Sequence, residues 1–157
     1  WSSVRVANLW LNGRITGEFG LNGAVCGEAG IPVIMVSGDQ TVCAEAREWA
    51  PGIVTAQVKT AAGRYAASCL PFEVSRKLIT NSARQAVSSF LAKKHPAPIQ
   101  LKTPVTVTIE FFHSHMGDQA SLLPGAVRLD GRRIEFKAAS MVEAYLGFRA
   151  AVNMVSM

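Results

Sequence analysis

Glu18 is the residue whose type and setting point most clearly to chemistry. It lies in the block Gly17-Glu18-Phe19-Gly20-Leu21-Asn22, where small residues bring its carboxylate close to backbone at the start of an apolar helix. A carboxylate in an apolar setting is costly unless it is paired or bound to a metal. The alternative is an ordinary helix N-terminal carboxylate, which the free N–H groups and the helix dipole favour. The residues alone favour this second interpretation.

A second candidate is the histidine pair in His113-Ser114-His115, which has Glu110 and Asp118 nearby. Such a pair binds zinc only where a third and a fourth ligand converge with it. Neighbouring strand positions face opposite ways, and this run lies at the end of an expected strand. We therefore interpret both residues as solvent-facing loop histidines and predict no metal between them.

Other motifs carry less chemistry. The spacing Gly17-x-x-Gly20-x-x-Gly23 differs from the G-x-G-x-x-G of dinucleotide-binding loops, and it lies inside the expected helix. Close packing of that helix explains the glycines better. No nucleophile motif of the G-x-S-x-G kind occurs. The three cysteines have no metal-type spacing, which indicates reduced thiols in a cytoplasmic protein: Cys26, Cys43 and Cys69.

The elements that position Glu18 follow from apolar periodicity and turn signals. Residues 4–11 predict a strand, Asn12-Gly13 a tight turn, and residues 14–16 a short return strand. The helix is expected over residues 18–29 and ends at Gly30.

A β-α-β unit follows this helix. The continuous apolar run 31–37 predicts a strand buried on both faces, inside a sheet with helices on both sides. Asp39 is the expected N-cap of a second helix, and residues 53–59 return as a strand. This order predicts the α/β class, with a mixed sheet covered by helices on both faces.

The second half mixes helices and strands. After a loop around residues 63–65, the pattern predicts a long helix with an apolar stripe over residues 71–94 and a linker over 95–98. A strand is expected over 105–112 and a hairpin over 126–136. A last helix is expected to start at the capping box Ser140-x-x-Glu143.

Composition limits the possible partners. The 157 residues are 49% hydrophobic and only 17% charged, so we expect some apolar surface to meet another segment or subunit, near Trp1, Trp10 and the helix of Glu18. The net charge is +5, but the basic residues are scattered, so nucleic acid is not an expected partner. No apolar run has the length of a membrane span, and no signal-peptide pattern occurs, so no membrane contact is expected.

A series of short motifs runs along the whole chain. The motifs are Asn12-Gly13, the block at residues 17–22, the run Ile-Pro-Val-Ile-Met-Val at 31–36, Gly38-Asp39, Val58-Lys59 followed by Arg64, Ile109-Glu110-Phe111, Leu122-Leu123-Pro124-Gly125 and Glu143-Ala144-Tyr145. In order and spacing this series resembles the zinc-dependent D-aminopeptidase family of the DppA type. The resemblance covers essentially all of this chain but little more than half of a family chain.

The resemblance implies that residues 1–157 form the C-terminal portion of a larger two-part α/β enzyme. Residues 1–70 would be a β-α-β part that carries the metal ligand, and residues 71–157 would hold the long helix, strand, hairpin and terminal helix. Glu18 would be the metal ligand, and the expected contacts to substrate are Asn22, Lys59 and Arg64. The N-terminal part would supply the other ligands of two zinc ions and a catalytic histidine just before Trp1, so this chain alone would be inactive.

The resemblance also implies an activity and an assembly. Family members are metallopeptidases that release N-terminal D-amino acids from short peptides with zinc-activated water, and they form homodecamers. Two departures are visible: His113 and His115 match no family metal position, and Gln40 replaces a second acid. The alternatives are a non-catalytic oligomeric binding or assembly module on the same scaffold and, disfavoured by the glycine spacing, a nucleotide-binding α/β domain.

Overall fold

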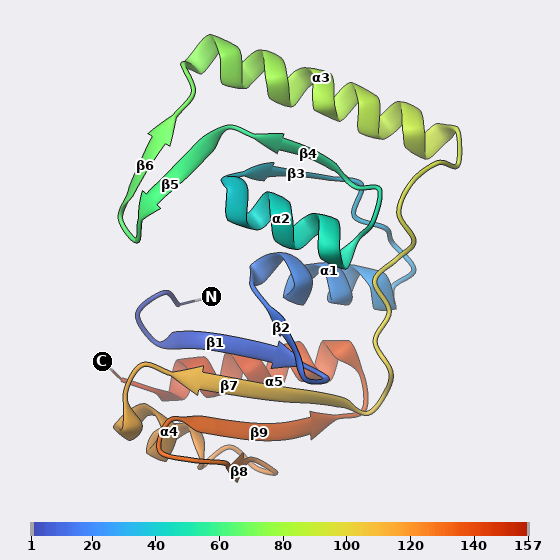
Figure 1. Cartoon of the computed structure of the whole chain (residues 1–157). Helices are drawn as coiled ribbons and strands as arrows, with labels where there is room; N and C mark the ends of the chain where they lie inside the picture. Colours follow the sequence, from blue (N-terminus) through green and yellow to red (C-terminus); the bar gives the residue numbers. More distant parts are fainter. Residues whose placement is uncertain (1, 157) are drawn as a thin grey trace.

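The larger sheet forms the base of the molecule. The computed structural model describes residues 2–156, in which this sheet is antiparallel throughout with the order β2-β1-β7-β9-β8 (Figure 1). Its strands are β1 (Val6–Leu11), β2 (Arg14–Thr16), β7 (Val105–Phe111), β8 (Val127–Arg128) and β9 (Arg133–Ala138). Because β1 pairs with β7, this sheet joins residues from both halves of the chain.

The central strand β7 shows why the sheet has one apolar face. Val105, Val107, Ile109 and Phe111 are fully buried, and the residues between them are half-buried. This alternation matches the two-residue period of a strand, and helix α5 (Met141–Met154) packs against it. The Ser140 hydroxyl accepts a hydrogen bond from the Glu143 N–H at 3.1 Å, which confirms the predicted start of the last helix.

The turn between β1 and β2 is also as predicted. Asn12 and Gly13 both have positive φ, at 50° and 78°, as a tight two-residue hairpin requires. The Asn12 side chain accepts from the Thr106 N–H and donates to the Lys102 carbonyl, each at 2.8 Å. The turn is therefore fastened to the start of β7.

The predicted β-α-β unit is confirmed in the upper part of Figure 1. Strand β3 (Met35–Gly38), helix α2 (Gln40–Trp49) and strand β4 (Val54–Gln57) follow one another, and the two strands pair in parallel. Asp39 caps α2 by accepting from the N–H groups of Thr41 and Val42 at 2.9 and 3.0 Å. Helices α2 and α3 (Phe72–Leu91) contact opposite faces of the pair, so the α/β class is confirmed.

The expectation for residues 31–37 was wrong in two respects. Strand β3 starts only at Met35, and within residues 2–156 it pairs with β4 alone, so it does not lie inside a wider sheet. Met35 and Val36 are half-buried and Ser37 is exposed. The physical reason is that Pro32 has no N–H for a ladder, and that Val33, Met35 and Val36 form the wall of a groove beside α1.

A hairpin of two strands and a short helix were not predicted. Strands β5 (Lys59–Gly63) and β6 (Ala66–Cys69) form an antiparallel hairpin whose turn is the predicted loop at residues 63–65. Helix α4 (Ser114–Ala120) follows β7 directly, so the histidine pair lies at a helix start and not in a loop. None of the helices formed by residues 2–156 is long and apolar enough to cross a bilayer.

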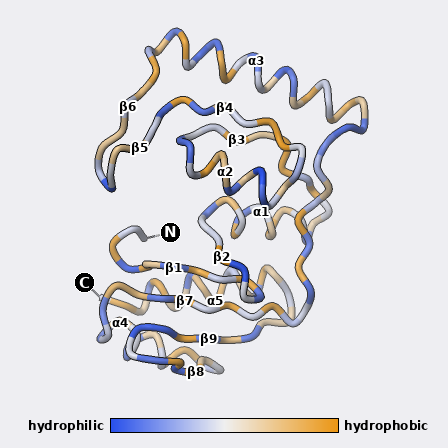
Figure 2. The backbone as a smooth tube through the Cα atoms, viewed as in Figure 1, coloured by the Kyte–Doolittle hydropathy of each residue, from blue (hydrophilic) through white to orange (hydrophobic). Residues whose placement is uncertain are grey.

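Helix α3 carries several exposed apolar side chains, and Figure 2 shows hydrophobic and hydrophilic residues alternating along it. Only Ser82 and Ala86 of this helix are buried, whereas Phe72 is 76% and Leu91 75% exposed. The sequence predicted such surface near Trp1, Trp10 and α1, and the open apolar groove beside α1 agrees with the last of these. Trp1 lies outside the described residues, and Trp10 is half-buried, although its cross-strand neighbour Ile15 is 58% exposed.

Candidate functional site

Glu18 and Asn22 line one groove. They lie one turn apart on α1 (Glu18–Glu28), and both side chains are exposed. The groove is open, encloses about 450 Å³, and runs between α1 and the segment that leads into β3. Its apolar wall is formed by Phe19, Val33, Met35, Val36 and Val42. The arrangement combines a carboxylate and an amide with an apolar surface, which is typical of sites for small organic ligands.

The start of α1 is capped by a residue from another helix. The N-cap residue Gly17 has no side chain to use, and Glu45 of α2 takes its place. One oxygen of Glu45, Oε1, accepts from the Gly17 N–H at 2.7 Å and the Gly20 N–H at 3.1 Å, and the Thr16 hydroxyl lies 3.1 Å away. Glu45 is thus the side chain that accepts from these two N–H groups, and Glu18 adds a second negative charge in the same first turn.

One feature of the sequence indicates the contact between Glu45 and the start of α1. Glu45 lies between Val42 and Trp49 at helical spacing, within the inward stripe of α2. A carboxylate within an apolar stripe needs buried donors, and the N-terminus of a helix offers them. The partner itself could not be identified because it lies 25 to 29 residues away in sequence.

The glycines of α1 permit close contact, as the spacing predicted. A Cβ on Gly17 would lie 2.5 Å from Glu45 Oε2, and one on Gly20 would lie 2.8 Å from the Trp49 ring. A Cβ on Gly27 would overlap the backbone of Ile99. These glycines serve helix packing and not a phosphate loop.

The other end of α1 is fastened in the same manner. The Glu28 carboxylate accepts from the Met141 N–H at 2.7 Å and from the Val142 N–H at 3.0 Å, so it caps the start of α5. Both ends of α1 are therefore held by carboxylate-to-backbone contacts between helices. The groove-lining residues of α1 stand on a rigid support.

Lys59 and Arg64 lie away from this groove. Lys59 is exposed at the start of β5, and Arg64 lies in the turn of the β5–β6 hairpin. The Arg64 guanidinium is 4.7 Å from the Phe112 ring centre, beside a separate cavity of about 330 Å³ that His113 also lines. The structure brings Glu18 and Asn22 together and places the other two candidate substrate contacts elsewhere.

The histidine pair forms a stack. The rings of His113 and His115 are 5.7 Å apart and nearly parallel, at 9°, and both residues are exposed. Within residues 2–156, no three His, Cys, Asp or Glu side chains gather closely enough to hold a metal ion. The described residues therefore do not make a complete zinc site, although Glu18 offers an oxygen of the kind that zinc accepts.

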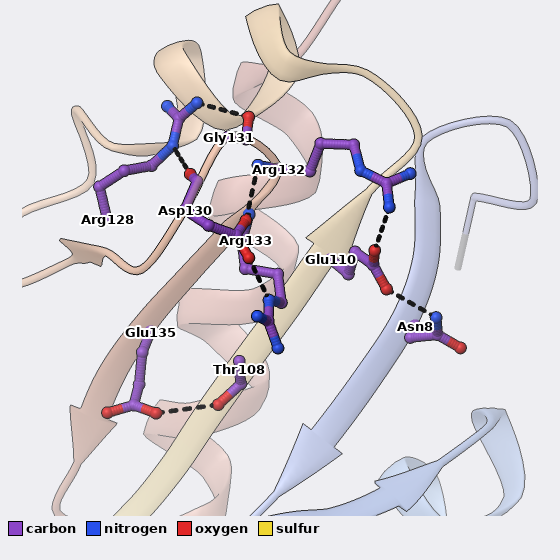
Figure 3. Close-up of polar contacts among 9 residues, drawn as sticks. All are labelled: Asn8, Thr108, Glu110, Arg128, Asp130, Gly131, Arg132, Arg133 and Glu135. Carbon is purple, nitrogen blue, oxygen red and sulfur yellow. Dashed lines mark hydrogen bonds and ion pairs between the residues drawn. The ribbon is translucent and has the colours of Figure 1, made fainter.

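The two carboxylates near the histidines are bound by other groups. Glu110 accepts from Asn8 at 2.7 Å and from Arg132 at 2.6 Å, as Figure 3 shows. Asp118 accepts from Arg128 at 2.8 Å. These contacts fasten β7 and α4 to their neighbours, which gives both acids a structural role.

Asp130 has a turn role that its pKa reflects. It accepts from the N–H groups of Arg132 and Arg133 at 2.8 Å each, and from the Arg133 side chain at 2.6 Å. The Arg132 backbone bond and the Arg133 side chain lower the pKa of Asp130 to about 2. The predicted hairpin turn is confirmed by these contacts.

Comparison with known proteins identifies relatives of this chain. The sequence profile of the D-aminopeptidase family matches residues 1–150. A D-aminopeptidase of Bacillus subtilis (strain 168) is 33% identical over 141 residues, which are 89% of this chain and 50% of that protein. The solved structure of the Zn-dependent D-aminopeptidase DppA from Bacillus subtilis, described as a self-compartmentalizing protease, matches with a TM-score of 0.89 and 31% identity, over 96% of this chain and 54% of that one.

The chain spans about half the length of these two relatives. The profile match covers nearly all of its residues, and the structural match extends the agreement to the arrangement of its helices and strands. On these grounds, the chain belongs to the D-aminopeptidase family.

Proposed function

We propose that this chain provides one wall and one metal ligand of the active site of a zinc-dependent D-aminopeptidase. The observation that carries the proposal is the place of Glu18 in the groove, on a helix whose end is capped by Glu45. Metal binding is the role of Glu18 that best fits the family. Zinc in such a site polarises a carbonyl and activates a water molecule.

The residues of this chain would act by holding and orienting. Glu18 would supply a carboxylate oxygen to the metal, and Asn22, one turn further on, would bind a peptide N–H or carbonyl of the substrate. Phe19, Val36 and Val42 would exclude water and take the apolar part of a D-residue. Lys59 and Arg64 would contact substrate only if the peptide extends beyond the groove.

The remaining ligands of the site have to come from outside residues 2–156. We place them, with the catalytic histidine, in the half of the relatives' length that this chain does not span. The full-length protein would then hold two zinc ions per subunit, and this chain alone would not hydrolyse peptides. Its substrates would be short peptides with an N-terminal D-residue.

The uncovered helix α3 supports an oligomeric state. Apolar side chains exposed along its length are suited to contact with another subunit. We propose a homo-oligomer, with a decamer as the expected size. The three free cysteines accord with a reducing compartment, and we propose the cytoplasm.

The test uses the full-length protein and its Glu18→Gln variant. We expect about two zinc ions per wild-type subunit, and a loss of zinc and of D-alanyl-peptide hydrolysis by at least about 100-fold in the variant, because a metal ligand is removed. Glu48→Gln, the same change at an exposed site on α2, should alter neither. A Glu18→Gln protein with normal zinc and activity would refute the proposal, and a wild type without zinc or activity would favour the non-catalytic assembly module.

A further inference from the structure

We propose that Glu45 is a positioning residue for Glu18: it fixes the backbone turn from which Glu18 reaches the metal. The inference rests on the proposed function of Glu18 as a zinc ligand. It concerns a residue of α2 that does not line the groove and that the motifs of the family did not single out.

The first step is the place of the two hydrogen bonds. Glu45 Oε1 accepts from Gly17 and from Gly20, which flank Glu18 on either side within the first turn of α1. Two bonds to one oxygen from both sides of a residue fix the direction in which its Cα–Cβ bond points. The orientation of Glu18 is therefore set by the position of Glu45.

The second step is that the N-cap residue supplies no side-chain cap to this turn. Its N-cap Gly17 carries no side chain, and glycine is the residue with the greatest backbone freedom. Without Glu45, two N–H groups at the helix end would have to find water. The first turn would then fray, and Glu18 would lose a fixed direction toward the metal.

The third step is that α2 itself is firmly placed. Trp49 packs against Gly20, and Arg14 of β2 lies over the Trp49 ring at 3.9 Å. Glu45 is thus held by a helix that contacts both α1 and the hairpin before it. A metal ligand needs placement to within about 0.5 Å, and a rigid neighbour supplies it.

A merely structural cap would behave differently, and the chain offers a matched control. Glu28 is also a carboxylate that caps a helix start from a neighbouring helix, through two N–H groups of α5. It lies at the far end of α1, more than two turns from Glu18. Removing Glu28 should weaken the fold without moving the metal ligand.

The experiment measures zinc affinity by chelator competition in the full-length protein and in four variants. Glu45→Ala should lower the zinc affinity by about 10- to 100-fold. Glu45→Gln keeps an acceptor oxygen, so its zinc affinity should stay within about 3-fold of wild type. Glu28→Ala should also stay within about 3-fold. Glu18→Gln should lose zinc altogether. If Glu45→Ala does not fold, Glu45→Asp, shorter by one methylene, should show a fall of about 10-fold.

The outcomes separate the two claims. Unchanged zinc affinity in folded Glu45→Ala or Glu45→Asp, or an equal fall in Glu28→Ala, would overturn the positioning role. Zinc loss in Glu18→Gln together with normal affinity in folded Glu45→Ala or Glu45→Asp would overturn this inference alone. Retained zinc in Glu18→Gln would overturn the proposed function on which it rests.

Discussion

Helix α1 is tightly packed, whereas helix α3 is mostly exposed. Helix α1 is short, has five buried residues among its eleven, and is held at both ends by the carboxylates of Glu45 and Glu28. Helix α3 has twenty residues but buries only Ser82 and Ala86, and no side chain caps its start. The short glycine-rich helix is therefore the fixed element, and the long one presents a surface.

This difference separates two tasks. A metal ligand or substrate contact needs a support that does not move, which the start of α1 provides through tight packing and the Glu45 cap. A surface for another polypeptide needs exposed apolar area, which α3 provides. The comparison predicts that substitutions on α1 affect folding and the site, whereas those on α3 affect association.

The largest expected effect is at Gly27. Gly27→Ala should lower the free energy of unfolding by about 3 kcal/mol, because the new methyl would overlap the Ile99 backbone and force α1 from its place. Urea unfolding measures this change. Thr80→Ala at an exposed position of α3 should stay within about 0.5 kcal/mol. Equal effects at both positions would remove the contrast between the helices.

The next effect is loss of the cap at the far end of α1. Glu28→Ala should lower the free energy of unfolding by about 1–2 kcal/mol, because two N–H groups of α5 lose their acceptor. On α3, Glu73→Ala breaks only an exposed ion pair with Arg76 and should cost less than about 0.5 kcal/mol. Thermal unfolding of the two variants compares them directly, and a larger loss in Glu73→Ala would contradict the assignment.

The surface of α3 gives the third prediction. The double variant Val87→Glu, Leu91→Glu should change the free energy of unfolding by about 0.5 kcal/mol or less, since both side chains are exposed. It should nevertheless reduce association of the full-length protein in sedimentation, because charge replaces apolar contact. The control is the double variant Thr80→Glu, Ser88→Glu, which adds the same charge to α3 at polar positions. An unchanged oligomer in the first variant would exclude this face as an interface.

The smallest effect concerns Asp130, far from both helices. Its pKa is about 2 in the folded protein, against about 4 in the unfolded chain, so the ionised carboxylate stabilises the hairpin. This stabilisation is fully present above pH about 4 and is lost as pH falls through about 2. Asp130→Asn should be slightly less stable than wild type at pH 6, and the difference should shrink steadily as pH falls from about 4 through about 2. Parallel unfolding curves across this range measure it. A constant difference would show that charge plays no part.

Local signals predicted the parts of the fold that local contacts make. The caps Asp39 and Ser140 bond to backbone within a few residues, and the turn Asn12-Gly13 needs positive φ at two adjacent residues, so residue types and spacing sufficed. The same holds for the β-α-β order. The place of Glu18 at a helix start was predicted too, but its metal role came from the family resemblance and stays a prediction.

Contacts between distant residues were not predictable in this way. Glu28 bonds to a residue 113 positions away, and only the fold brings them together. The apolar run at residues 31–37 could not reveal whether it faced a sheet or a groove, because both bury apolar side chains. The strands of the β5–β6 hairpin consist mostly of Ala, Gly and Ser, which carry no strand signal.

The central claim is that α1 holds Glu18 as a zinc ligand, and diffraction at the zinc absorption edge from crystals of the full-length protein tests it most directly. The account predicts anomalous density at the groove, with a zinc ion about 2.0–2.2 Å from a Glu18 carboxylate oxygen. Zinc bound with Glu18 well beyond that distance, or held instead by His113 and His115, would contradict it.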